Sequence, residues 1–204
     1  MATMHYLFFG ILSVAVFVLG RVGNAAVAHS NGSGNYAGCG NIDPVAVNMD
    51  LALVGCSAVS HIRERIVSIA VQEVGVREAT GSNDGKRVEE YLSYVGLGKG
   101  YAWCAAFASW CYGRAGLVAP RNAWSPALFP IARRYKNEQV QRSAVRQADL
   151  FAIYSQSLGR INHVGIVRKK ERNWIITVEG NSSDCVLTKR RPLATIYAFS
   201  NWLD

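Results

Sequence analysis

The stretch YAWCAAFASWCY, residues 101–112, follows a glycine-rich lead and forms a dense apolar helix pattern with Cys104 near its start. Little within the stretch is polar, and Gly116 ends the pattern. A helix that is apolar on most of its sides is buried in the middle of a domain rather than lying on its surface. The stretch therefore predicts a central helix around which the rest of the chain packs.

Cys104 lies where the glycine-rich loop becomes this helix. The first N–H groups of a helix have no partner within the helix, and the helix dipole adds partial positive charge there. Both effects favour a thiolate over a thiol, so a cysteine at this position is a better nucleophile. Free cysteine is also a common core residue. The stretch alone supports both interpretations, and only a base elsewhere in the chain favours the first.

Length and charge limit the classes of protein. A chain of 204 residues has room for one ordinary domain and an N-terminal extension. Residues 1–60 hold one Arg and two Asp, net −1, so residues 61–204 hold 21 basic and 12 acidic residues, net +9. A basic domain attracts polyanions, such as nucleic acid or an anionic bacterial envelope. No helix-turn-helix, zinc-finger or RNP-like pattern is present, which disfavours nucleic acid. The basic clusters at 133–134, 168–170 and 189–191 are interpreted as solvated edges.

The N-terminus contains an uncharged apolar run of 14 residues, Tyr6–Leu19, followed by small residues. A membrane-spanning helix needs about 20 residues, so the run suits the core of a signal peptide. We therefore predict a signal peptide over residues 1–25 and export to the periplasm, the cell envelope or the extracellular space. No Lys or Arg precedes the run, so an uncleaved membrane anchor is the alternative. Residues 26–59 are predicted as a linker and residues 60–204 as the catalytic domain.

The five cysteines and the acidic residues give no sign of a metal or cofactor. Cys104 and Cys111 are separated by about 10 Å along a helix, beyond the reach of a disulfide. Cys39 and Cys56 are free to pair in an oxidising compartment. No C-x-x-C or H-x-x-x-H spacing indicates zinc, and Asn83-Asp84-Gly85 is too small an acidic set for calcium.

The spacing of apolar residues along the chain changes near Gln147 from a helical to a strand-like pattern. Before it, helical spacing predicts a helix after an N-cap at Ser60, a second one over 88–95 and the Cys104 helix. After it, β-branched and aromatic runs predict short strands at 149–154, 163–167, 174–179 and 196–199. Helices followed by strands indicate an α+β domain with an antiparallel sheet.

Two polar residues flank the predicted hairpin in this sheet. His163 begins one strand, Glu179 ends the next, and 168–173 form the turn. In an antiparallel pair the start of one strand lies beside the end of its neighbour. We therefore expect His163 to lie beside Glu179 or Asn181, where a carboxylate or amide can hold the imidazole in one tautomer. If the start of the Cys104 helix docks at this end, a thiol, a base and an orienting group converge.

Five short motifs occur in order along the chain: EVG at 73–75, WCAAF at 103–107, DL at 149–150, NHVGIV at 162–167 and VEGN at 178–181. Together they resemble the CHAP (cysteine, histidine-dependent amidohydrolase/peptidase) domain over Ile62–Leu203. The resemblance implies a papain-like α+β fold, in which N-terminal helices, including the nucleophile helix, pack on a C-terminal antiparallel sheet. It also implies Cys104 as nucleophile, His163 as base and Glu179 as orienting group, with Asn181 as a further polar member.

The oxyanion site is less clearly marked, because no polar side chain except Tyr101 lies just ahead of Cys104. We expect Tyr101 and the Cys104 backbone N–H to bind the developing oxyanion. Tyr101, Trp103 and Trp124 are candidates to line a substrate groove. The alternative for Tyr101 is simple packing, and for Trp103 it is the core.

The family resemblance implies a cysteine-dependent peptidoglycan hydrolase that cleaves an amide bond in cell-wall peptide. Both an endopeptidase and an N-acetylmuramoyl-L-alanine amidase fit this description, with peptidoglycan as the partner. Two alternatives remain at this point. The same three groups can transfer the acyl group to an amine rather than to water, and a wall-binding or assembly module can carry Cys104 as a core residue.

Overall fold

The computed structural model describes residues 44–141 and 144–203, and the side chains of 44–56 and 141 lie outside this description. Helices come first and strands follow, which confirms the predicted α+β class. The helices are α1 (Pro44–Gln72), α2 (Lys86–Tyr94), α3 (Cys104–Arg114) and the short α4 (Asn137–Gln141). Three 3₁₀ turns are η1 (Ser125–Leu128), η2 (Ile131–Arg133) and η3 (Leu193–Thr195).

Helix α1 begins earlier than the sequence indicated, because Ser60 lies inside it rather than capping it. Pro44 is its first residue, a position where the fixed φ of proline suits a helix, and no proline interrupts the chain again before Pro120. The domain boundary after residue 59 stays a prediction. Within the described ranges no helix is long and apolar enough to cross a membrane. The apolar run Tyr6–Leu19 and Cys39 fall outside the described residues.

The five strands form one antiparallel sheet in the order β4-β3-β2-β1-β5. They are β1 (Leu150–Ser155), β2 (Arg160–Glu171), β3 (Trp174–Glu179), β4 (Leu187–Pro192) and β5 (Ala198–Ser200). The hairpin predicted between the second and third strands is present, and Ile166 pairs with Val178 across it. In this register His163, near the start of β2, and Glu179, at the end of β3, lie at the same end of the sheet.

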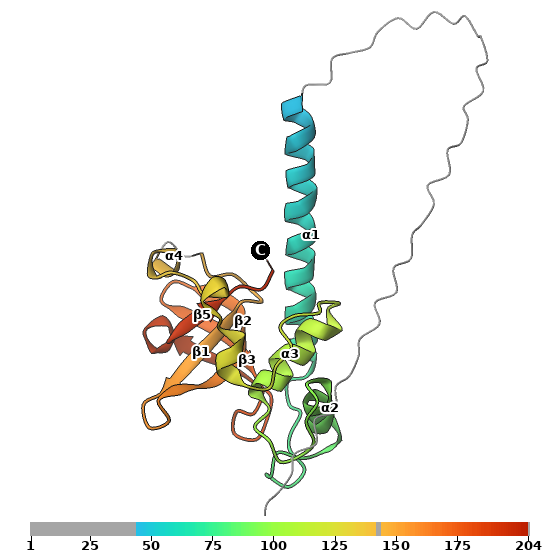
Figure 1. The fold of residues 1–204 in the computed structure, drawn as a ribbon, viewed down its shortest axis with the longest axis vertical. Helices are drawn as coiled ribbons and strands as arrows, with labels where there is room; N and C mark the ends of the chain where they lie inside the picture. The colour runs from blue at the N-terminus through green and yellow to red at the C-terminus, as the bar shows by residue number, and fades with distance from the viewer. Residues whose placement is uncertain (1–43, 142–143, 204) are drawn as a thin grey trace, which may run out of the picture. The chain divides into compact units, whose positions relative to one another are not determined.

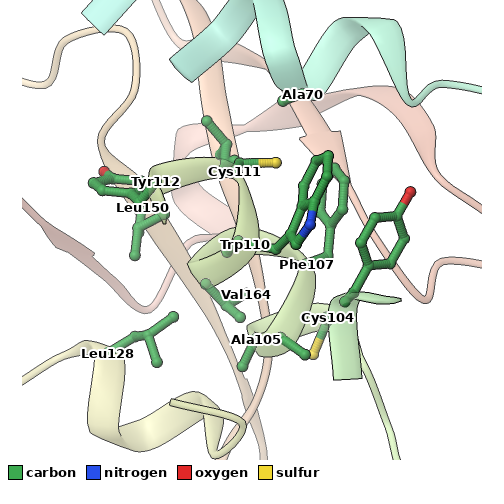
Figure 2. Close-up of a cluster of buried hydrophobic side chains, with 14 of the residues drawn as sticks. Ala70, Cys104, Ala105, Phe107, Trp110, Cys111, Tyr112, Leu128, Leu150 and Val164 are labelled. Atoms are coloured by element: carbon green, nitrogen blue, oxygen red, sulfur yellow. The ribbon is translucent and has the colours of Figure 1, made fainter. Parts of the chain in front are cut away.

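Helix α3 lies between α2 and the sheet, as Figure 1 shows. Every residue from Cys104 to Tyr112 is buried, as the sequence predicted. Figure 2 shows its side chain Tyr112 beside Leu150 of the sheet. Phe107 and Trp110 pack instead against Tyr91 of α2. Because burial of each such side chain stabilises the fold by about 1.5–3 kcal/mol, α3 is held firmly at a fixed place on the sheet.

A buried ion pair attaches α1 to the start of the sheet. Arg63 Nη1 donates to Asp149 Oδ1 at 2.8 Å, and both side chains are almost fully enclosed. Asp149 also accepts a hydrogen bond from the Tyr135 hydroxyl at 2.8 Å. Burial raises the pKa of Asp149 although these partners oppose the rise. The acid of the DL motif is therefore a structural residue that joins the helical layer to the sheet.

Candidate active site

Cys104 is the first residue of α3, and the N-cap residue Trp103 gives no side-chain hydrogen bond to the helix. The Cys104 side chain is almost fully buried, with an exposure of 4%. Its Sγ lies 3.4 Å from the Ser125 hydroxyl and receives hydrogen bonds from the His163 imidazole and the Val164 backbone N–H. Three separate segments of the chain thus meet at the sulfur.

His163 lies on β2 and bonds to Glu179 at the end of β3. The distance from His163 Nε2 to Glu179 Oε2 is 2.8 Å, so the neighbourhood predicted from the hairpin is present. A carboxylate only accepts hydrogen bonds, so Nε2 carries the proton and Nδ1 is the ring nitrogen left to face the sulfur. Continuing the strand register places Gly165 opposite Glu179. A Cβ at Gly165 would lie 2.9 Å from Glu179 Cγ, so glycine leaves room for the carboxylate to reach His163.

Glu179 has no exposed surface, and three side chains donate hydrogen bonds to its carboxylate. Besides His163, Arg191 donates through Nε and Nη2 to both carboxylate oxygens at 2.6 Å, and the Thr177 hydroxyl donates to Oε1 at 2.6 Å. Burial alone would raise the pKa of Glu179. The hydrogen bonds from Arg191, His163 and Thr177 outweigh burial and lower the pKa to about 2. Glu179 is therefore an anion throughout the physiological pH range.

The charges of Cys104 and His163 stabilise one another. Burial raises the pKa of the Cys104 thiol, but hydrogen bonds from His163, Ser125 and the Val164 N–H lower it below the ordinary value. For His163, burial lowers the pKa, while Cys104 and Glu179 raise it more strongly, to about 9. Both shifts favour a thiolate beside an imidazolium at neutral pH. Such a pair is the reactive form of a cysteine nucleophile.

Asn181 does not take the place expected for a second orienting group. Its side-chain amide lies 2.7 Å from Asn83 Oδ1. With the amide oxygen turned toward Trp103, that oxygen accepts from the Trp103 backbone N–H at 3.0 Å. The backbone carbonyl of Asn83 also accepts a hydrogen bond from the Gly100 backbone N–H at 2.9 Å. Asn181 and Asn83 thus fasten the loop that leads into Cys104, whereas Glu179 is the residue that holds the imidazole.

The three aromatic candidates separate into two groups. Trp103 is fully buried, packs beside Tyr91 and Phe107, and donates its indole N–H to Glu78 at 2.7 Å. Trp103 is therefore a core residue and lines no substrate groove. Tyr101 and Trp124 are 57% and 58% exposed, on the segments that lead to Cys104 and to Ser125. A role for these two side chains in binding a substrate stays a prediction.

Sequence reasoning missed three residues that contact the central groups. Arg191 was interpreted as part of a solvated basic edge, but it is paired with buried Glu179. Thr177 precedes Glu179 by two residues in a strand and so shares its face, a signal that was available. Ser125 lies far from Cys104 along the chain and no motif marks it. Its role depends on how the loop after α3 returns to the helix.

A polar pocket of about 340 Å³ opens beside His163. Its lining includes hydroxyl and amide groups and the Arg191 guanidinium. The residues are Ile153, Asn162, His163, Asn181, Ser182, Ser183 and Arg191. In the described part of the chain, no three His, Cys, Asp or Glu side chains are grouped closely enough to hold a metal ion. The pocket offers hydrogen-bond donors and acceptors to a peptide-like ligand.

Residues 96–181 match the family model of the CHAP domain, and the matched segment contains Cys104, His163, Glu179 and Asn181. The resemblance to this family is thus confirmed, over a shorter range than the motifs suggested.

Two solved structures are similar to this one. They are a protein described as similar to lipoprotein, of the NLP/P60 family, from Staphylococcus aureus, and an NlpC/P60 family protein from Bacillus cereus. The first is 13% identical with a TM-score of 0.45, covering 71% of this chain and 42% of its own. The second is 15% identical with a TM-score of 0.44, covering 70% of this chain and 40% of its own. This chain thus spans about two fifths of the length of each. No curated protein matches the chain.

Proposed function

We propose that this protein is a cysteine-dependent peptidoglycan hydrolase that cleaves an amide bond in cell-wall peptide. The observation that carries the proposal is the meeting of Cys104, His163 and Glu179, with the imidazole bonded to the carboxylate at 2.8 Å and in contact with the sulfur. The match to the CHAP domain supports peptidoglycan as the substrate. The net charge of +9 over residues 61–204 suits an anionic wall.

In the first half of the reaction, the Cys104 thiolate attacks the amide carbonyl carbon and the carbonyl oxygen becomes negative. The backbone N–H of Cys104, at the open start of α3, is the first candidate donor to that oxygen, and the exposed Tyr101 hydroxyl is the second. The imidazolium of His163 then gives its Nδ1 proton to the leaving nitrogen. The C–N bond breaks, the amine departs and a thioester to Cys104 remains.

In the second half, neutral His163 takes a proton from water through Nδ1, and the resulting hydroxide attacks the thioester carbonyl. The C–S bond breaks, the carboxylic acid product leaves, and the thiolate–imidazolium pair is restored. Glu179 holds Nε2–H throughout, so the ring keeps one tautomer and one orientation. No step needs a group beyond water and these side chains.

The test is a digest of purified peptidoglycan with wild type and Cys104→Ala, followed by identification of the fragments by mass. We expect new fragments from wild type alone, and the fragment masses identify the cleaved amide as a peptide cross-link, a stem peptide bond or the link to the sugar. A wild-type protein that folds yet releases nothing would remove the proposal. Products extended by an added amine would instead indicate acyl transfer.

We further propose that the protein acts outside the cytoplasm, in the cell envelope or beyond it, because its substrate lies there. The apolar run Tyr6–Leu19 with small residues after it supports this proposal. Expression in a bacterial host, followed by fractionation and mass measurement of the exported chain, tests it. A mass lacking about the first 25 residues identifies a cleaved signal peptide, whereas a full-length chain in the membrane fraction indicates an anchor.

A further inference from the structure

Ser125 is a buried polar residue that contacts the sulfur of Cys104. Its hydroxyl lies 3.4 Å from Sγ, and the residue is only 6% exposed. Because a hydroxyl carries one proton on a rotatable bond, it can donate to an anionic sulfur while its lone pairs stay free. Hydrogen bonds to ionised groups are stronger than those between neutral groups. The contact thus matters most when Cys104 is a thiolate.

The loop that carries Ser125 is fastened to α3 on one side. The Ser109 hydroxyl of α3 donates to the Asn122 carbonyl at 3.0 Å. The Ser109 hydroxyl oxygen also accepts a hydrogen bond from the Asn122 backbone N–H at 3.1 Å. The Asn122 side chain in turn accepts the Trp124 backbone N–H at 2.8 Å. The helix that presents the sulfur therefore also holds the start of η1, where Ser125 lies.

The other end of η1 is fastened to the end of the sheet. The Leu128 carbonyl accepts hydrogen bonds from the Ser200 hydroxyl at 2.8 Å and from the Trp202 indole at 3.1 Å. Leu128 itself is fully buried in the core cluster. With both ends fixed, the position of the Ser125 hydroxyl relative to the sulfur is set by the fold rather than by chance rotation of a surface loop.

We propose that Ser125 is a further member of the catalytic site, whose hydroxyl donates a hydrogen bond to the Cys104 thiolate and keeps the nucleophile ionised. This inference rests on the proposed role of Cys104. Together with His163 and the Val164 N–H, Ser125 gives the sulfur a third donor, on a segment separate from the sheet. Ser125 exchanges no proton in the net reaction, so the steps described above stay balanced without it.

The test measures the rate at which iodoacetamide alkylates Cys104 between pH 4 and pH 10. Tandem mass spectrometry of the tryptic peptide 100–114 separates Cys104 from Cys111, which the same peptide contains. The variants are Ser125→Ala, Ser125→Thr, which keeps a hydroxyl, and Ser157→Ala, whose exposed hydroxyl lies beside that of Ser155 instead of the sulfur. Circular dichroism checks the fold of each variant.

In Ser125→Ala we expect the midpoint of the rate profile to rise by about one pH unit, with a rate about tenfold lower below the midpoint. The plateau at high pH should not fall, because a more basic thiolate is intrinsically more nucleophilic. Ser125→Thr and Ser157→Ala should keep the wild-type midpoint. A wild-type midpoint in folded Ser125→Ala overturns the proposal, and so does a rate reduced equally at every pH.

If Ser125→Ala does not fold, Ser109→Ala decides instead, because it loosens the loop without removing the hydroxyl. We then expect a smaller rise of the midpoint, and an unchanged midpoint overturns the proposal. Alkylation needs no substrate, so its outcome is independent of the digest. A protein that shows the Ser125 effect but cleaves no peptidoglycan would defeat the proposed function and leave this inference intact.

Discussion

Arg191 and Glu179 are joined by two hydrogen bonds of 2.6 Å. The guanidinium Nε donates to Oε1 of the carboxylate, and Nη2 donates to Oε2. Glu179 is fully enclosed, whereas the Arg191 side chain keeps 23% of its surface exposed. Because the carboxylate has a permanent cation beside it, it stays ionised even when His163 is neutral. The imidazole thus has a constant anionic partner through both halves of the proposed reaction.

Removing the imidazole should abolish most turnover. For His163→Ala we expect a loss of about 10²–10⁴-fold in the rate of peptidoglycan cleavage, since the proposed proton donor to the leaving amine is gone. The measurement is the release of new amines from peptidoglycan over time. His61→Ala is the matched control, because His61 lies exposed on α1 near Glu64. A His163→Ala variant with wild-type rates would take this residue out of the mechanism.

The rate should depend on pH through the thiolate–imidazolium pair. His163 has its pKa raised to about 9, so we expect kcat/KM to decline as pH rises through about 9. On the acid side of the pH profile, kcat/KM should fall as Cys104 becomes protonated. Because the pKa of Cys104 is lowered, this acid limb lies below the pH expected for an ordinary thiol. Cleavage rates from pH 4 to pH 11 test both limbs. An alkaline limb near pH 6.5, the ordinary value for histidine, would contradict the geometry described here.

Neutralising Glu179 should move this alkaline limb. In Glu179→Gln the imidazolium loses its anionic partner, so the pKa of His163 falls and the limb shifts to lower pH. Asn181→Ala should reduce the rate by loosening the loop before Cys104 but leave the alkaline limb in place, because the Asn181 amide bonds to Asn83 or, with its oxygen turned the other way, to the Trp103 backbone N–H. Equal shifts in both variants would show that Asn181 also acts on the imidazole.

Arg191→Met should destabilise the fold because it leaves Glu179 buried without its guanidinium. Loss of one partner of a buried ion pair costs about 3–5 kcal/mol, and the partial exposure of Arg191 favours the lower figure. Urea denaturation measures the change. Arg190→Met is the control, since Arg190 lies more exposed over Trp174. A loss no larger than in Arg190→Met would mean that Arg191 is an ordinary surface cation.

The ion pair of Arg191 with Glu179 also predicts how the stability difference between wild type and Arg191→Met varies with pH. The pKa of Glu179 is lowered from 4.5 to about 2, so its stabilising contribution is complete above pH 4.5 and is lost as pH falls through about 2. The gap between wild type and Arg191→Met should therefore narrow below pH 4.5. A gap that stays constant down to pH 2 would assign the effect to packing of the arginine instead.

Gly165→Ala should displace the Glu179 side chain and so disturb its hydrogen bond to His163. An added Cβ would lie 2.7 Å from the Phe151 ring and 2.9 Å from Glu179 Cγ, so the carboxylate must move away from His163. We expect a loss of about 1–3 kcal/mol in stability, typical of overpacking, together with a lower cleavage rate. Gly98→Ala is the control, because no atom lies within 4 Å of its added Cβ. Normal stability and rate in Gly165→Ala would contradict the close approach.

Much of the fold could be predicted because its local patterns agree with its packing. The apolar stretch around Cys104 became the buried helix α3, and the runs near His163 and Glu179 became neighbouring strands. Antiparallel pairing then brought these two residues together, since two strands joined by a short turn have few alternative arrangements. The start of α1 was misjudged, because Ser60 suits an N-cap yet nothing before it stops a helix.

The sequence by itself determined the α+β class, the central helix with its cysteine and the approach of His163 to the segment of Glu179 and Asn181, because each follows from periodicity or from a short hairpin. Only the tertiary structure decided that Arg191 holds Glu179, that Asn181 serves the loop before Cys104, and that Ser125 reaches the sulfur. These contacts join segments whose meeting depends on how strands, helix and loop pack in three dimensions. A side chain in a basic run or a serine in a loop has the same local pattern whether it faces solvent or a buried charge.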